Sequence, residues 1–303
     1  MEPLTLVTVS RNYFNMPLWV ADHVGFFADE GLDVTVELHE PIDAIVERLR
    51  DGRAQVGCGV TEQVILDAEQ GGSLVIVGGN VNKLPFDLVA APDVHSFADM
   101  RGRTVGVSSL EAGSSSLVMK LFEAHGLHHP EDYEMRAVGP ILARWDELRA
   151  GRIQAGLQGI PLNYVALDAG YTTLAQPRET FPDFQFTSLN VDREWARANE
   201  DTLVRVLRAC VRAHAWFYEN REAATDIAVA ETGVAREYTL RAWDDYTRDE
   251  IFPRDGDASD AAVATLIEVS ALIRALDRRA GTRPADYIDR RYLQAARASL
   301  VAS

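Results

Sequence analysis

The chain contains very few cysteines and lysines. Among its 303 residues are two cysteines, Cys58 and Cys210, and two lysines, Lys83 and Lys120. Two cysteines in separate apolar runs provide neither a disulfide framework nor the ligand spacing of a zinc site. Any reaction through a Schiff base would have to use one of the two lysines. We therefore expect buried thiols, no metal and no cofactor.

Positive charge and long apolar runs are also scarce. Lysine and arginine total 30 against 46 aspartates and glutamates, which gives a net charge of −16. This balance argues against nucleic acid, which requires a basic face, and against an anionic membrane surface. No stretch approaches the roughly 18 apolar residues of a membrane span, and no secretion signal is visible. The sequence as it stands favours a cytoplasmic protein. A periplasmic or extracellular location would require that a signal had been removed.

The hydrophobic pattern alternates between strands and helices over about the first 190 residues. Such alternation predicts parallel sheets with helices on their faces. The expected strands cover 4–10, 32–39, 54–60, 73–79, 102–109, 133–139, 153–160 and 171–176. The expected helices cover 17–31, 42–52, 61–72, 114–126, 140–151 and 162–170, followed by 194–220, 221–232, 234–249 and 258–279.

One short unit occurs twice in the chain. Residues 49–57 read LRDGRAQVG and residues 148–156 read LRAGRIQAG. In both copies a helix ends at a glycine and the next strand begins, and the flanking elements have the same order. Chance remains an alternative, because L-R-x-G-R is a common string in an arginine-rich chain. The repeat favours two similar α/β lobes, whose strand ends would face a shared ligand cleft.

The segment WVADHVGFFADEGLDVTVEL (19–38) resembles a signature of type II periplasmic solute-binding proteins. The resemblance is to the nitrate, sulfonate, taurine and thiamine-pyrimidine-precursor group (SsuA/NMT1-like). It extends to SFADMRGRTVGVSS (96–109), to 195–220 and to YIDRRYLQAA (287–296). It implies an α/β fold of two lobes, each a mostly parallel sheet flanked by helices, with the ligand cleft between them.

The resemblance also implies a division of the chain. The first lobe would contain 1–89 and 191–303, the second 90–190, with a hinge near 86–92 and 185–191. The chain departs from the family at Gln55 and Gln154, where the family more often has aspartate.

Candidate ligand-binding residues follow the strand ends. Aromatic rings beside amides suit a planar polar ligand, and serines with glycine at a helix N-terminus suit an anion. Each of these residues could instead be an ordinary loop, cap or surface residue. The candidates are Arg11, Asn12, Tyr13, Phe14, Asn15, Thr61, Glu62, Lys83, Phe86, Ser109, Gly113, Ser114, Ser115, Gln158, Gly159, Ile160 and Asn163.

Other polar residues are expected to be structural. His214 and Trp216 lie in a helical segment and are more typical of a core. The histidines of HGLHH (125–129) lack a carboxylate or cysteine to complete a metal site, so we expect a surface cluster.

Two classes of function stay open. The first is a solute-binding protein that closes around a small anionic or polar aromatic molecule, such as a sulfonate, carboxylate or pyrimidine. It would be a monomer and would serve an ABC transporter or act as a sensor. The second is an enzyme on the same fold, a lyase, decarboxylase, isomerase or desulfinase-like protein acting on a small organic acid.

The sequence favours binding over catalysis. The related desulfinase requires a cysteine in the first loop, where this chain has Asn12, Tyr13 and Phe14. The related precursor synthase has a cysteine-rich run and uses pyridoxal phosphate with a histidine, and no histidine lies in the three candidate loops 10–16, 59–62 and 80–86. Glu62 and Lys83 are the only acid–base pair that the pattern supplies.

Overall fold

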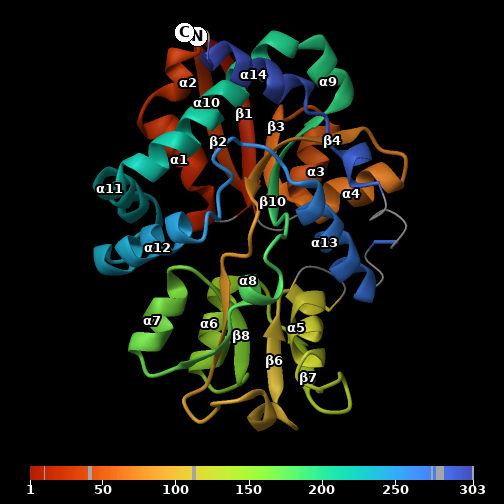
Figure 1. Ribbon diagram of the computed structural model, residues 1–303, viewed down its shortest axis with the longest axis vertical. Coiled ribbons are helices and arrows are strands. Elements are labelled where there is room, and N and C mark those ends of the chain that lie inside the picture. Colours follow the sequence, from red (N-terminus) through yellow and green to blue (C-terminus); the bar gives the residue numbers. More distant parts are fainter. Residues whose placement is uncertain (10, 40–42, 111–113, 274–275, 278–282, 302–303) are drawn as a thin grey trace.

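Two five-stranded sheets form the two lobes of the molecule (Figure 1). The computed structural model describes residues 1–303 except 10, 40–42, 111–113, 274–275, 278–282 and 302–303. Both termini lie at the far end of the first lobe. Two segments that cross between the sheets join the lobes.

The two sheets have the same strand order and the same directions. In each, three strands pair in parallel and the fourth strand runs antiparallel between its neighbours. This confirms the predicted fold of two mostly parallel, helix-flanked sheets. The first sheet has the order β2 (Leu32–His39), β1 (Glu2–Val9), β3 (Val56–Val60), β10 (Thr187–Asp192), β4 (Leu74–Val81). The second has the order β7 (Glu134–Ala137), β6 (Thr104–Val107), β8 (Ala155–Gly159), β5 (Phe86–Ala90), β9 (Thr172–Ala175).

Helices cover both sheets, and two predicted helices are broken. The expected helix over 17–31 is two helices, because Gly25 adopts a φ of +90° between them. The expected helix over 194–220 is interrupted at Asn199. None of the described helices is both long and apolar enough to cross a membrane. The helices are α1 (Met16–His23), α2 (Phe26–Asp29), α3 (Asp43–Arg50), α4 (Thr61–Glu69), α5 (Ser114–Glu123), α6 (Ile141–Arg149), α7 (Leu162–Asp168), α8 (Pro177–Thr180), α9 (Arg193–Ala198), α10 (Glu200–Glu219), α11 (Arg221–Thr232), α12 (Arg236–Arg248), α13 (Asp260–Ser270) and α14 (Arg291–Val301).

Gln55, in the first repeat copy, bridges a strand and a glycine turn through its side chain. Its side-chain Oε1 accepts a hydrogen bond from the N–H of Thr5 at 2.8 Å, and its Nε2 donates to the carbonyl of Gly52 at 3.1 Å. Its own N–H also donates to the Thr5 carbonyl at 3.0 Å. One amide therefore joins β1 to the glycine turn that ends α3.

Gln154 makes the same three contacts in the second lobe. Its Oε1 accepts from the N–H of Thr104 at 3.1 Å, its Nε2 donates to the Gly151 carbonyl at 3.0 Å, and its N–H donates to the Thr104 carbonyl at 2.8 Å. An aspartate could accept but could not donate to the glycine carbonyl. The repeat is thus a structural unit used once in each lobe, and both glutamines fill the same bridging role.

The crossing strands belong to the opposite sheets from the lobes first expected. β5 pairs with β8 and β9 in the second sheet, whereas β10 pairs with β3 and β4 in the first. The sequence division had placed 86–89 in the first lobe and 187–190 in the second. The segments that cross between the lobes are residues 82–85 and 181–186. The sequence division differed because the periodicity of a strand does not reveal which sheet the strand joins.

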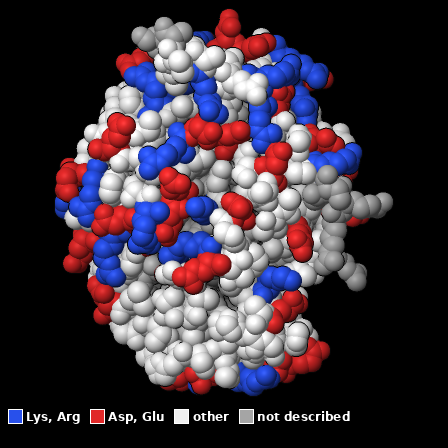
Figure 2. All heavy atoms as spheres, viewed as in Figure 1, with Lys and Arg blue, Asp and Glu red and all other residues white. Residues whose placement is uncertain are grey.

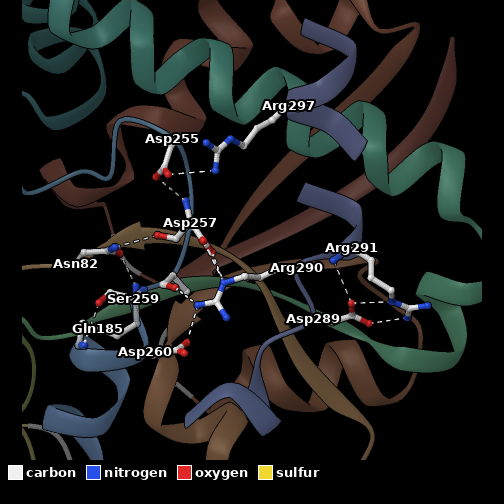
Figure 3. Close-up of polar contacts among 12 residues, drawn as sticks. Asn82, Gln185, Asp255, Asp257, Ser259, Asp260, Asp289, Arg290, Arg291 and Arg297 are labelled. Carbon is white, nitrogen blue, oxygen red and sulfur yellow. Dashed lines mark hydrogen bonds and ion pairs between the residues drawn. The ribbon is translucent and has the colours of Figure 1, made fainter. Parts of the chain in front are cut away.

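A polar cluster fixes both crossings to the first lobe (Figure 3). Gln185 Nε2 donates to Asn82 Oδ1 at 2.8 Å, which joins one crossing to the other. Asn82 Nδ2 donates to the Asp257 carbonyl at 2.9 Å, and the N–H of Ser259 donates to Gln185 Oε1 at 3.2 Å. Arg290 Nε lies 2.9 Å from Asp257 Oδ1. The loop before α13 therefore holds both connections in place.

The predicted core residues are buried. Cys58 and Cys210 are free, buried thiols, and His214 is 1% exposed. Trp216 is partly buried against the core. On the face shown in Figure 2, acidic and basic side chains are interspersed over the first lobe, and much of the second lobe carries neither. The acidic excess is not gathered into one patch on this face.

Candidate functional site

The aromatic candidates of the first loop pack into the core. Tyr13 is 1% exposed, and its ring centroid lies 4.9 Å from that of Tyr246. Phe14 is also buried and meets Phe186 edge-on at 5.5 Å. Burial raises the pKa of the Tyr13 hydroxyl well above its ordinary value. These rings contact protein in the described structure, and ligand contact by them stays a prediction.

The polar candidates of the first loop also have protein partners. Arg11 forms an ion pair with Glu231. Asn15 accepts from Thr8 Oγ1 at 2.9 Å and donates to the Val9 carbonyl at 3.2 Å. Asn12 is partly buried. These contacts tie the loop to the first lobe.

Thr61 and Glu62 begin α4 and are buried. Thr61 Oγ1 donates to Ser188 Oγ at 2.9 Å. Glu62, 3% exposed, accepts from Ser270 Oγ at 2.9 Å. Burial raises the pKa of Glu62, and the Ser270 hydrogen bond partly opposes this. Glu62 therefore ionises less readily than the solvated carboxylate that the sequence pattern predicted.

Lys83 lies in the first crossing, and Phe86 follows it as the first residue of β5. Lys83 Nζ donates to the Asp249 carbonyl at 2.7 Å, and the Phe86 ring meets Phe186 edge-on at 4.9 Å. No ion pair joins Lys83 to Glu62 among the described residues. The acid–base pair that the sequence supplied is therefore not assembled, since each group has a separate partner.

Arg178 on α8 joins the lobes, a role that the sequence did not reveal. Its Nη1 lies 2.8 Å from Asp87 Oδ1 in the second sheet, and its Nε lies 2.8 Å from Asp249 Oδ2 in the first lobe. Burial disfavours the charge, but the two carboxylates together raise the pKa of Arg178. Asn163 Nδ2 donates to Asp87 Oδ2 at 2.8 Å, and the described residues offer no partner to the buried Asn163 Oδ1.

A second contact between the lobes joins α7 to α12. The Tyr164 hydroxyl hydrogen-bonds to Asp245, and the Arg241 guanidinium lies 3.8 Å from the centre of the Tyr164 ring. Arg241 Nη1 also lies 3.5 Å from Asp168 Oδ1. Together with Arg178, these residues hold the two lobes against each other along one side (Figure 1).

The serine candidates cluster at the start of α5. Ser114 and Ser115 are buried. The N–H of Ser108 donates to Ser114 Oγ at 2.7 Å, and Ser115 Oγ donates to the Ser109 carbonyl. Gly113 lies outside the described residues. The described residues of the turn after β6 thus bring the serines together, and anion binding by them stays a prediction.

Arg144 on α6 also reaches this turn, and the sequence reading missed it. It is 4% exposed, and its Nη1 donates to Ser114 Oγ at 3.0 Å. Burial lowers its pKa to about 10. A signal was present in the sequence: Arg144 falls on the same helical stripe as the buried Ile141 and Leu148, a face that is normally apolar.

Gln158, the last residue but one of β8, has a side chain whose hydrogen-bonding atoms are unused. It is completely buried, and neither Oε1 nor Nε2 has a hydrogen-bond partner in the described structure. It lies opposite Asp87 in the sheet register. Gly159 is partly buried and Ile160 is 3% exposed. Of the sequence candidates, Tyr13, Gln158 and Asn163 have buried hydrogen-bonding atoms without a partner in the described part of the chain.

The histidine cluster makes contacts within the second lobe. His125 stacks on Phe97 at 3.8 Å, and His129 Nδ1 lies 3.1 Å from the Tyr133 carbonyl oxygen. Within the described ranges, no three or more His, Cys, Asp or Glu side chains are grouped so that they could hold a metal ion.

Solved structures of low sequence identity share this fold. The periplasmic nitrate-binding protein NrtA from Synechocystis PCC 6803 matches with a TM-score of 0.82 at 14% identity, covering 100% of this chain and 90% of that chain. The alkanesulfonate-binding protein SsuA from Xanthomonas axonopodis pv. citri, bound to MOPS, matches with 0.75 at 16% identity, covering 96% and 99%. The desulfurization enzyme DSZB matches with 0.73 at 14% identity, covering 99% and 100%. Binding proteins and an enzyme therefore share the fold, which at these identities is all the likeness shows.

The family is established by sequence. No curated protein sequence matches the chain. The family model described as NMT1/THI5 like matches residues 12–224, which is more than half of the chain and includes the second sheet completely. Together with the two-lobed fold shared with nitrate-binding and sulfonate-binding proteins, this match shows that the chain belongs to the NMT1/THI5-like family.

Proposed function

We propose that the protein binds a small polar solute between its lobes without changing it chemically. The observation that carries the proposal is the Gln158 amide, which is completely buried at a strand end and has no described partner. A buried amide left unsatisfied costs about 1–3 kcal/mol. A solute that supplies both an acceptor and a donor removes this cost, and ligands of α/β sheets bind at such strand ends.

The solute class follows from the chemistry of the candidate residues. Serine hydroxyls at the start of α5 and the amides of Gln158 and Asn163 suit a small anionic or polar aromatic molecule, such as a sulfonate, carboxylate or pyrimidine. The nitrate and alkanesulfonate that NrtA and SsuA bind support an anionic solute. As in the ligand-binding component of an ABC import system from Staphylococcus aureus, which shares the fold, a transporter permease would be the partner.

Binding would be coupled to rotation of the lobes about residues 82–85 and 181–186. Two narrow connections between rigid sheets are typical of hinge closure. The Arg178 ion pairs to Asp87 and Asp249 then hold the closed form, since they join the lobes directly. The solute would shift the equilibrium towards this form by contacting both lobes.

Catalysis is the second candidate function, favoured only by the shared fold of DSZB. Glu62 and Lys83 have separate protein partners, and this weakens the acid–base set that an enzyme would need. Thermal melts and calorimetry with methanesulfonate, benzoate, nitrate and an aminopyrimidine distinguish the two functions. We expect saturable binding of at least one compound, which mass spectrometry recovers unchanged. A product in the same mixture would contradict the binding function.

Gln158→Leu tests the observation that carries the proposal. Leucine has a similar size but no polar atoms, so without solute the variant should be more stable than the wild type, by about 1–3 kcal/mol, and it should bind solute weakly. Gln70→Ala, at an exposed position, is the control and should bind normally. Wild-type affinity in Gln158→Leu would mean that the solute lies elsewhere.

A further inference from the structure

Arg144 is a buried cation that no carboxylate neutralises among the described residues. It is 4% exposed, and its stem packs against β8: a Cβ built on Gly156 would lie 3.9 Å from Arg144 Cδ. Its hydrogen bond is to a neutral hydroxyl, Ser114 Oγ, and its buried Nε has no partner in the described ranges of the chain. Arg178 is comparably buried but has two carboxylates. A buried charge without a partner of opposite charge strongly destabilises a protein. A bound anion would supply such a partner for Arg144.

The neighbours of Arg144 add donors rather than acceptors. Ser114 Oγ accepts from both the Ser108 N–H at 2.7 Å and Arg144 Nη1 at 3.0 Å. These bonds occupy both lone pairs of the hydroxyl, so its own proton goes to Ser108 Oγ, 3.0 Å away. Ser108 Oγ also lies 3.3 Å from the Ser114 N–H, which leaves the Ser108 proton to be donated outward. Arg144 and Ser108 therefore present donors to the same region.

The electrostatic field at this point is positive from several sources. The N-terminus of α5, a helix of 10 residues, has a partial positive charge, and Arg144 points at its first residue. Arg144 is also the fourth residue of α6, so its charge lies near a second helix N-terminus. A cation is unfavourable at both places, whereas an anion between them would be stabilised by all three charges.

Gln158 is a second observation that points to a ligand on the same side of β8. It follows Gly156 by two residues, so its side chain lies on the sheet face against which the Arg144 stem packs. Its amide is wholly buried and has no partner among the described residues. A ligand at this face would meet a guanidinium and a neutral amide together.

We propose that Arg144 is the residue that recognises the charge of the solute. It binds a carboxylate or sulfonate group of the solute against the start of α5, with the Ser108 hydroxyl as a further donor. This inference rests on the proposed solute-binding function and narrows it, because a neutral pyrimidine would leave the guanidinium unneutralised. The solute is therefore an organic acid, and its polar neutral part faces Gln158.

Pairs of acids and their neutral amides test the role of Arg144. The probes are benzoate with benzamide and methanesulfonate with methanesulfonamide, titrated by calorimetry into the wild type, Arg144→Met and Arg144→Gln. The wild type should bind at least one acid about 30-fold or more tightly than its amide, since loss of one partner of a buried charge pair costs about 2 kcal/mol or more. Both variants should lose this preference and bind acid and amide equally weakly.

The control is Arg149→Met, which removes an exposed arginine from the same helix. It should keep the wild-type preference for acids. If the wild type binds none of the acids more tightly than the matching amide, or if the Arg144 variants keep the preference, the charge role is wrong. Amide binding with no acid preference would leave solute binding standing. Conversion of an acid that Arg144 binds would refute the proposed binding function and leave the charge role intact.

Discussion

Replacing Arg144 with methionine should stabilise the protein in the absence of solute. Burial lowers the pKa of Arg144 to about 10, against about 12.5 for an exposed arginine. At about 1.4 kcal/mol for each pKa unit, the folded state loses about 3 kcal/mol by holding this charge away from water. The guanidinium is charged in both the folded and the unfolded state at any pH below 10, so the full penalty is present at pH 7.

The hydrogen bond to Ser114 offsets part of this penalty. It contributes about 1 kcal/mol, and Ser114 Oγ keeps the donor of Ser108 after the substitution. Arg144→Met should therefore raise the free energy of unfolding by about 2 kcal/mol, and the melting midpoint by about 4 °C or more. The methionine also preserves most of the contact that the arginine stem makes with β8.

Urea denaturation and thermal melts at pH 7, in buffer free of organic acids and sulfate, measure the effect. Arg149→Met should change the free energy of unfolding by about 0.5 kcal/mol or less, because exposed substitutions are usually small in effect. A saturating acid should reverse the order of stability, since only the wild type gains from it. A less stable ligand-free Arg144→Met would refute the reasoning, because the charge would then be compensated within the protein.

Four further substitutions test other ionisable side chains. Glu62→Gln should raise the free energy of unfolding at pH 7 by roughly 1 kcal/mol, because burial raises the pKa of Glu62. The gain should disappear as the pH falls below the ordinary range of a carboxyl. A gain that persists in urea melts at pH 3 would contradict this reasoning. Burial lowers the pKa of His214 to about 4, so the unfolded state gains a proton first as the pH drops from about 6.5 to 4. The free energy of unfolding should fall by about 3 kcal/mol across that window. In urea melts at each pH, His214→Leu should show a weaker dependence of this free energy on pH. Arg178→Met leaves the buried Asp87 without its ion-pair partner, which should lower the free energy of unfolding by about 3–5 kcal/mol. Asp249→Asn should lower it less, because Asp249 is the more exposed of the two carboxylates that contact Arg178. Equal losses of unfolding free energy in urea denaturation would contradict this difference in burial.

The sequence predicted the fold well because its signals are local. Strand and helix periods and the glycines after helices repeat in the same order in both lobes, and Gly52 and Gly151 end corresponding helices. Element breaks were harder: the turn at Gly25 splits a helix without interrupting its apolar pattern. The sequence also did not predict which sheet β5 and β10 join, because strand pairing depends on contacts between residues far apart in the chain.

The positions of the candidate residues after strand ends were predictable, but the directions of their side chains were not, and ligand binding by them stays a prediction. A loop after a strand end is easily identified, yet nothing local showed that Tyr13 turns into the core beside Tyr246. Arg144 was missed for the opposite reason, because it lies within a helix rather than at a strand end. Its place on a buried stripe with Ile141 and Leu148 was the available signal.

Under the proposed function, we expect the two lobes to have unequal roles in binding. The first-lobe candidates Thr61, Glu62 and Lys83 each have protein partners, and the unpartnered Tyr13 hydroxyl belongs to a ring that packs into the core. In the second lobe, the Gln158 amide and Arg144 Nε have no partner among the described residues. A solute should therefore bind the second lobe first, and closure should follow through the contacts between lobes. Arg178→Met should then weaken affinity through faster dissociation, while the association rate stays near the wild-type value in stopped-flow measurements. A slower association with unchanged dissociation would show instead that the first lobe receives the solute.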